Sequence, residues 1–337
     1  MAEDPYLKLT ARERLEVLDT VSRQRGIAPS ILEKDYWVCR TLGVLFALDP
    51  LGAHLVFKGG TSLSKAYGLI DRFSEDVDIS FHREFLGFGP DADPEAATGN
   101  QQRKRLEALQ QACTECIRDR LRPALQAAMR QELGSSGWSV EVASDDAQTL
   151  LFHYPQSGVS GLSYIAPSVR IELGARSDHW PQERRDIRSL IGETLNQPLG
   201  HATVQTLAAE RTFWEKATLL HAEAHRAASQ SMPARYARHY HDLARLALSP
   251  VADRALADLD LRRRVVAHKS VYFRSAWARY DLAVPGTFRL LPPPSRLADL
   301  ERDHQAMKQM FFSPPPPIDQ VLQTLSALET RIRSLPV

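Results

Sequence analysis

Two glycines and two aspartates form the part of the chain best suited to chemistry. Gly59 and Gly60 follow a short apolar run, and Asp76 and Asp78 stand one residue apart shortly afterwards. Glycine lets the backbone turn tightly and approach a ligand closely. Two carboxylates so close together repel each other unless a cation lies between them, and Mg²⁺ prefers oxygen ligands. The combination indicates a site for a metal-bound nucleotide.

The glycine turn carries further groups that suit a phosphate. Thr61 and Ser62 follow the glycines where a helix is expected to begin, and Lys65 comes about one turn later. Free N–H groups and the helix dipole favour an anion at such a position. The spacing is not that of a P-loop. Taken alone, such a turn is more often a plain connection between a strand and a helix with a Ser/Thr cap.

The acidic residues fit a two-metal site. In a strand, Asp76 and Asp78 lie on the same face, and Glu172 in "SVRIELGAR" is the best candidate for a third carboxylate. Two metal ions held by shared carboxylates suit an in-line attack on phosphorus. Glu172 is also a candidate for the base that takes the proton of an acceptor hydroxyl. A D-x-D pair alone is usually an exposed acidic strand edge, but the combination with the glycine turn favours catalysis.

The surrounding sequence predicts the elements that would position these residues. Apolar spacing predicts two helices over residues 6–47, a helix over 61–70, a long helix over 101–133 and a last helix over 318–332. Strands are expected at "HLVFKG", "DVDISFH", "WSVEVAS", "TLLFHYPQ" and "SVRIELGAR". From about Thr206 onward the pattern is helical. We therefore expect an α+β fold with a mixed sheet, flanking helices and an all-helical C-terminal part.

Composition narrows the class of protein. The 337 residues are 43% hydrophobic and 25% charged, with a net charge of +1, so no global field attracts a polyanion. The N-terminal residues do not resemble a signal peptide, and no run is apolar enough to span a membrane. Cys113 and Cys116 form a lone C-x-x-C that we interpret as incidental. These features predict a cytoplasmic protein.

Two further patterns require a choice between a functional and a structural explanation. His221 and His225 in "HAEAH" have the spacing of zinc-peptidase ligands, but Glu223 is misplaced for the catalytic base, so we set zinc hydrolysis aside. A basic and aromatic segment over 262–280 suits a nucleic-acid surface. A solvated helix explains that segment equally well. Its members are Arg262, Arg263, Arg264, Lys269, Tyr272, Phe273, Arg274, Trp277, Arg279 and Tyr280.

These motifs together resemble the nucleotidyltransferase superfamily of the DNA polymerase β type and, more narrowly, the AbiEii/AbiGii toxin family, which includes the MenT toxins. The first two motifs of that family resemble "FKGGTSLSKAY" and "RFSEDVDIS", and its N-terminal helix resembles "ILEKDYWVCRTL". Its later motifs resemble "TFWEKATLLH" and "ARHYHDLARL". The resemblance covers most of the chain.

The resemblance implies roles for single residues. Gly59, Gly60, Thr61, Ser62 and Lys65 would hold the nucleotide, and Asp76 and Asp78 would bind metal. Lys216 and Asp242 would be the essential residues of the later motifs. From the residues alone, the default interpretation of Lys216 is a lysine with a buried stem, and a helical ion-pair lattice is a strong alternative for Asp242. In the functional interpretation, Lys216 faces the triphosphate and Asp242 positions Lys216 or a basic residue over the nucleotide.

The leading hypothesis is a Mg²⁺- or Mn²⁺-dependent nucleotidyltransferase, the toxin of a type IV AbiE-like toxin–antitoxin pair. It would move a nucleoside monophosphate from an NTP to an acceptor, with tRNA implied by the resemblance, and would have a cognate antitoxin protein. The alternatives are transfer to a small molecule or a protein, and a non-catalytic nucleotide-binding interaction protein. The expected domains are N-terminal helices over 1–50, a polymerase-β-type nucleotidyltransferase domain over 51–205 and a helical domain over 206–337.

Overall fold

The computed structural model describes residues 4–74, 76–159, 166–227 and 229–336, which fall into two compact units. The first unit comprises Met1–Ala66 and Phe73–Leu207, and the second comprises Tyr67–Arg72 and Ala208–Val337. A short excursion of the chain thus belongs to the second unit although the residues on both sides of it belong to the first. The sequence did not predict this excursion, and the domain limits expected from it stay a prediction.

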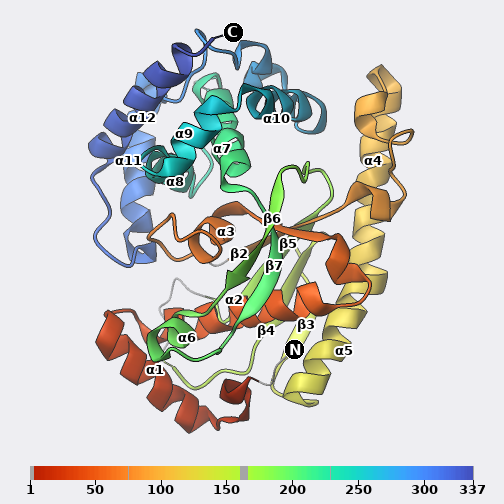
Figure 1. The fold of residues 1–337 in the computed structure, drawn as a ribbon, viewed down its shortest axis with the longest axis vertical. Coiled ribbons are helices and arrows are strands. Elements are labelled where there is room, and N and C mark those ends of the chain that lie inside the picture. The colour runs from red at the N-terminus through yellow and green to blue at the C-terminus, as the bar shows by residue number, and fades with distance from the viewer. Residues whose placement is uncertain (1–3, 75, 160–165, 228, 337) are drawn as a thin grey trace. The chain divides into compact units, whose positions relative to one another are not determined.

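One mixed sheet forms the centre of the first unit (Figure 1). Its order in the described residues is β3-β4-β5-β2-β1-β7-β6. β2 runs parallel to β5 and antiparallel to β1, which in turn runs parallel to β7. The strands are β1 (Leu55–Lys58), β2 (Asp76–Phe81), β3 (Ser139–Val142), β4 (Thr149–His153), β5 (Ser168–Gly174), β6 (Gln182–Ile187) and β7 (Ala202–Leu207).

The alternation of β2 explains why its aspartates face away from the core. Val77, Ile79 and Phe81 are fully buried, so Asp76 and Asp78 point to the opposite face. In β5, Val169, Ile171 and Leu173 are buried in the same way. The expected strand pattern is confirmed for both strands.

Helices cover the sheet of the first unit. α2 packs against β5 and β7, α5 packs against β3, and the short α3 packs against β1 and β2. Trp37 of α2 stacks on Tyr154 with 5.6 Å between ring centroids. The helices are α1 (Ala11–Arg25), α2 (Pro29–Ala47), α3 (Gly59–Lys65), α4 (Gly99–Cys116), α5 (Arg122–Leu133) and α6 (Leu190–Leu195), with a π-helical turn at Ile117–Leu121 between α4 and α5.

The second unit is helical in its described residues, which confirms the expected fold class. α7 packs against α8, α9 and α10, and α8 also contacts α11 and α12. The helices are α7 (Ala209–Ala224), α8 (Ala237–Ala247), α9 (Pro250–Ala257), α10 (Leu259–Tyr272), α11 (Leu297–Ala306) and α12 (Ile318–Arg333). No helix of the described residues is both long and apolar enough to cross a membrane.

Several elements differ from the sequence-based expectation. β6 and β7 were not expected, and the helix expected over 61–70 ends at Lys65. β6 escaped notice because it is an edge strand with the charged sequence "QERRDI", which lacks an apolar face. The helix cannot extend to residue 70, because Gly68 adopts φ +62°, a left-handed conformation.

Candidate active site

Three carboxylates lie on neighbouring strands of the first unit. Asp76 and Asp78 share one face of β2, and Glu172 of β5 stands beside Asp78 in the parallel register. Each of the three residues is partly exposed. The strand pairing thus brings the sequence-predicted acidic residues to one region of the sheet.

Gly59 leaves room for the carboxylate of Asp78. Its φ of +79° lies in the left-handed region, and a Cβ at this position would collide with the Asp78 carboxylate. The glycine turn and the acidic strand are therefore fitted to each other, which explains why a glycine is needed there.

Lys58 is a charged neighbour that the sequence analysis missed. It pairs with Asp78 in the antiparallel register of β1 and β2, and its Nζ lies 3.9 Å from Asp78 Oδ1. Both side chains are 26% exposed. The position directly before the glycines, on the strand next to the aspartates, was the signal that could have identified it.

The hydroxyl groups of the turn are used inside the protein. Thr61 Oγ1 donates to the carbonyl oxygen of Asp76 and also lies 2.9 Å from Ser74 Oγ. Ser62 Oγ donates to the Gly59 carbonyl oxygen at 2.9 Å. Both residues are buried. Their side chains thus fix the turn against β2, and the groups that the turn can offer to a phosphate are backbone amides.

Lys65 is held by a partner that lies thirty residues earlier in the chain. Its ammonium forms a buried ion pair with Asp35 of α2, and the Asp35 carboxylate also accepts the Leu190 N–H at 2.6 Å. Burial lowers the pKa of Lys65, but the Asp35 carboxylate more than offsets this and leaves the pKa raised. The lysine expected to reach a phosphate thus anchors α3 to α2.

Glu172 also has a basic neighbour. Arg170 Nε donates to Glu172 Oε1 at 3.1 Å, and the same guanidinium pairs with Asp145 at 3.1 Å. The Glu172 side chain remains 43% exposed. A contact with a ligand is therefore open to Glu172 without a change of fold.

The acidic residues have the donor chemistry of a magnesium site. In the described part of the chain, no three Asp, Glu, His or Cys side chains are already clustered closely enough to hold a metal ion. The two β2 carboxylates nevertheless share one face, and carboxylate oxygens are the ligands that Mg²⁺ and Mn²⁺ prefer. Asp76 and Asp78 thus fit the metal, and Glu172 is the nearest further donor in the strand register.

A second cluster of charges lies within the second unit. Asp242 of α8 accepts two hydrogen bonds from the Arg72 guanidinium, both at 2.8 Å, and one from Lys216 Nζ of α7, also at 2.8 Å. Arg72 and Asp242 are almost fully buried, and the Lys216 side chain is 9% exposed. The structure therefore brings the predicted pair Lys216 and Asp242 into contact and adds Arg72, which the sequence analysis missed.

Burial and charge set the ionisation of this cluster. Burial alone would favour a neutral Asp242, but Arg72 and Lys216 keep its pKa well below the ordinary value. Burial lowers the pKa of Lys216 and outweighs the opposite effect of Asp242. Burial and the Lys216 charge also hold the pKa of His239 well below its ordinary value. The Asp242 carboxylate is thus kept ionised by the guanidinium and ammonium groups that donate to it.

The structure also places the two histidines and two cysteines that the sequence analysis interpreted as non-functional. His221 Nδ1 accepts the Arg289 N–H at 3.1 Å, and its Nε2 lies 2.9 Å from the Arg279 carbonyl oxygen. His225 Nδ1 lies 2.8 Å from the His221 carbonyl oxygen. Cys113 and Cys116 are free and buried along α4. The contacts of His221 and His225 are thus hydrogen bonds to the backbone.

The basic and aromatic segment divides into buried and exposed members. Arg262 is 3% exposed and donates to the Ala283 carbonyl oxygen at 3.1 Å, and Tyr272 is buried as well. Arg264 and Arg274 are exposed. Only part of the segment can therefore meet a partner.

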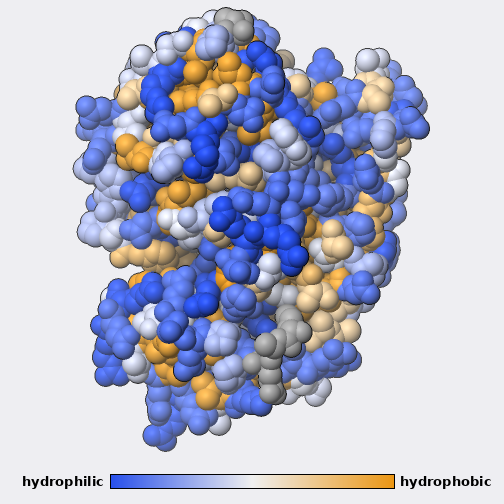
Figure 2. Space-filling model, viewed as in Figure 1, coloured by the Kyte–Doolittle hydropathy of each residue, from blue (hydrophilic) through white to orange (hydrophobic). Residues whose placement is uncertain are grey.

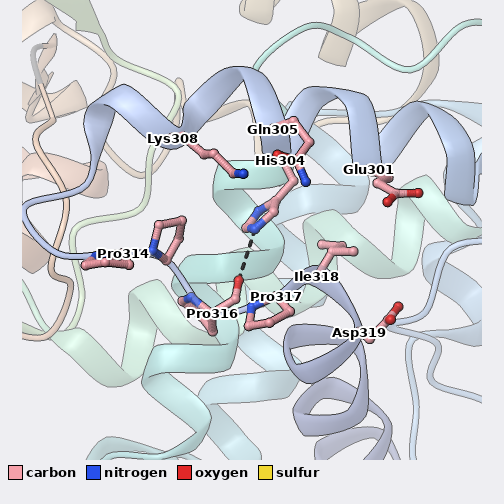
Figure 3. A pocket seen from close by; sticks show the side chains of 10 residues that line it. Glu301, His304, Gln305, Lys308, Pro314, Pro316, Pro317, Ile318 and Asp319 are labelled. Atoms are coloured by element: carbon pink, nitrogen blue, oxygen red, sulfur yellow. Dashed lines mark hydrogen bonds between the residues drawn. The ribbon is translucent and has the colours of Figure 1, made fainter.

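A pocket of about 520 Å³ lies in the second unit between α11, a proline run and the start of α12 (Figure 3). His304 Nε2 lies 3.0 Å from the Pro316 carbonyl oxygen across it. Its lining includes none of the predicted site residues. The residues are Glu301, His304, Gln305, Lys308, Pro314, Pro315, Pro316, Pro317, Ile318 and Asp319.

Comparison with known proteins extends these observations. A family model described as the nucleotidyltransferase AbiEii toxin of type IV toxin–antitoxin systems matches residues 40–324. Among solved structures, the chain is similar to MenT4, a nucleotidyltransferase toxin of Mycobacterium tuberculosis. The two share 19% identity over 95% of this chain and 99% of that chain, with a TM-score of 0.45. No match was found among curated proteins. The range matched by the family contains every predicted site residue.

Proposed function

The chain belongs to the AbiEii family of nucleotidyltransferase toxins, and from this premise we propose that it transfers a nucleoside monophosphate from an NTP to tRNA. The observation that carries the proposal is the placement of Asp76 and Asp78 on one strand face, with Glu172 beside Asp78 in the register. An acidic face next to a glycine turn suits transfer from a metal-bound nucleotide, because the carboxylates can hold the metal and the turn can approach the phosphates.

Asp76 and Asp78 would hold Mg²⁺ or Mn²⁺, with Glu172 as a further ligand. When bound, such an ion neutralises charge on the phosphates and favours attack at phosphorus. The protein contributes a strand pair that presents the carboxylates together. Lys58, 3.9 Å from Asp78, supplies a counter-charge to that carboxylate.

The Gly59–Lys65 turn would bind the triphosphate through its backbone. Lys58, the residue before α3, cannot cap the first N–H groups of the helix, because an ammonium group has no hydrogen-bond acceptor. Gly59 and Gly60 are partly exposed, and N–H groups at such a position favour anions. Thr61, Ser62 and Lys65 would act by fixing the shape of the turn, because their side-chain groups are already bonded inside the protein.

Lys216 would act on the phosphates as a point charge. Its side chain is 9% exposed, and it shares the carboxylate of Asp242 with Arg72. An ammonium group that a carboxylate holds in place can also pair with an anionic ligand. Asp242 would keep the Lys216 ammonium in one position.

The reaction would form a bond between an acceptor hydroxyl oxygen and the α-phosphorus. The bond from that phosphorus to the bridging oxygen breaks, and pyrophosphate leaves. Glu172, which is partly exposed, would take the proton of the hydroxyl. Toxicity would follow from loss of functional tRNA, and a cognate antitoxin protein would counteract it in the cytoplasm.

The test mixes the full-length protein with Mg²⁺, total tRNA and each α-labelled NTP in turn. Asp76→Ala is the inactive variant, and Asp91→Ala, at an exposed loop position, is the matched control. We expect label on RNA with one NTP, for the native protein and the control but not for Asp76→Ala. If label reaches only a protein or an added small molecule, the tRNA proposal is wrong. If Asp76→Ala labels RNA as well as the native protein, the assigned metal site is wrong.

A further inference from the structure

Contacts of Asp71 and Arg72 link the segment Tyr67–Arg72 to the rest of the second unit. Arg72 forms a backbone bridge with Phe311 and an ion pair with Asp242, and Ser313 Oγ donates to the Asp71 carboxylate. This explains why the segment belongs to the second unit although β2 begins only four residues after Arg72. Arg72 and Asp242 are buried, whereas Asp71 is exposed.

The pairing of Arg72 with Asp242 is bidentate. Nε donates to Oδ1 and Nη2 donates to Oδ2, each at 2.8 Å. Two parallel hydrogen bonds from a planar guanidinium fix the rotation of a carboxylate, which a lysine cannot do. The orientation of the Asp242 carboxylate is therefore set by Arg72.

Lys216 depends on that orientation. Its Nζ donates to Oδ2 at 2.8 Å, and this is the oxygen that Arg72 Nη2 also holds. His239 Nδ1 lies 3.5 Å from the same ammonium. A rotation of the Asp242 carboxylate would therefore move the main hydrogen-bond partner of Lys216.

A purely structural ion pair does not require that one carboxylate, Asp242, bind both a guanidinium and an ammonium group. A buried ion pair is often replaced by apolar residues without loss of stability, and here a second cation is added to a carboxylate that is already paired. The arrangement is explained if the cluster holds the Lys216 ammonium in position for an anionic ligand.

We infer that Arg72 is a positioning residue, whose guanidinium fixes the Asp242 carboxylate and through it the Lys216 ammonium. The inference rests on the proposed role of Lys216 toward the NTP phosphates. Arg72 itself would touch neither substrate nor metal. Its loss is expected to lower kcat because a small misplacement of a charged group reduces the rate by about tenfold to a hundredfold.

The experiment compares Arg72→Ala, Arg72→Lys, Arg72→Gln and Lys216→Ala, with Ser313→Ala as the matched control that breaks only the Asp71 contact. kcat and KM for the NTP are measured per folded molecule, as determined from thermal melts. Arg72→Ala is then assayed with a low concentration of guanidinium and, in parallel, with neutral urea of nearly the same shape. We expect guanidinium to restore several-fold activity, urea to restore none, and Ser313→Ala to keep the native kcat.

Each alternative outcome has a distinct meaning. Equal rescue by urea and guanidinium, or a native kcat per folded Arg72→Gln molecule, would overturn the positioning role. If Arg72→Ala does not fold, the order Arg > Lys > Gln in kcat carries the test, because a structural role predicts no such order among folded molecules. If Lys216→Ala keeps full activity, the proposed role of Lys216 fails first, and this is distinguishable from failure of Arg72 alone.

Discussion

At the scale of single residues, the site depends on the missing side chain of Gly59. Alanine there would meet both an unfavourable φ of +79° and the Asp78 carboxylate. Gly87 has a similar φ of +89° but open space around it, so Gly87→Ala isolates the backbone cost, about 1–2 kcal/mol. We expect both variants to lose that much stability, and only Gly59→Ala to lose about a hundredfold or more in kcat. Equal activity of the two folded variants would contradict the close fit between the turn and Asp78.

Alternation along the strands was sufficient to place the acidic residues correctly. Burial of Val77 and Ile79 follows directly from the sequence pattern, and with it the shared face of Asp76 and Asp78. Partners far away in the chain could not be predicted in this way. Nothing near Lys65 in the sequence indicates Asp35, and nothing near Asp242 indicates Arg72, because tertiary packing alone brings these residues together.

At the scale of elements, the ion pair of Lys65 and Asp35 joins α3 to α2. Removing one partner of a buried pair leaves an uncompensated charge and costs about 3–5 kcal/mol. We expect Asp35→Ala to lose more stability than Lys65→Met, because it also leaves the Leu190 N–H without its acceptor. Denaturant unfolding measures the free energy of unfolding of both variants.

Lys65→Met separates an anchoring role from direct contact with phosphate. If the lysine anchors α3, the variant loses stability, but KM for the NTP changes less than about tenfold per folded molecule. A large rise in KM with an unchanged free energy of unfolding would instead show that Lys65 leaves Asp35 to bind the nucleotide.

The sequence predicted elements with strong periodicity and missed those without it. β2, β5 and α12 show a clear apolar face and were expected close to their observed limits. β7, at Ala202–Leu207, was missed because its last residues run into the apolar spacing of α7. The fold class was therefore predictable, whereas the two strands at that side of the sheet were not.

The contacts of His221 in α7 predict a pH-dependent stability. Its Nδ1 accepts a backbone N–H, and burial lowers its pKa to about 4. Since an unfolded histidine has a pKa of about 6.5, the unfolded chain binds more protons between these values. The free energy of unfolding should therefore fall on acidification from pH 7 to pH 4, by about 3 kcal/mol at most for this residue.

Chemical denaturation at several pH values measures the slope of the free energy of unfolding against pH. His221→Gln should be less stable at pH 7 and less sensitive to acid than the native protein. His153→Gln, at an exposed histidine, is the control and should keep the native slope. An unchanged slope for His221→Gln would mean that other groups produce the pH dependence.

At the scale of the whole molecule, charge balance limits how an RNA could be bound. The net charge is +1, and the face visible in Figure 2 mixes hydrophilic residues with separate apolar patches. Attraction of tRNA must therefore come from local groups of basic residues rather than from the overall field. This requirement makes the exposed part of the segment over 262–280 the place to test.

Within that segment, only the exposed residues can contact RNA, and the buried ones cannot. Arg264 and Arg274 are exposed, so replacing either by alanine should raise KM for tRNA several-fold and leave KM for the NTP unchanged. Each change should also reduce the slope of log K against log salt by about 1, as expected for a lost phosphate contact. Arg262→Ala should instead lower the melting temperature, because Arg262 is buried and bonded to the Ala283 carbonyl oxygen. If both exposed variants keep the native KM and salt slope, the acceptor binds elsewhere on the molecule.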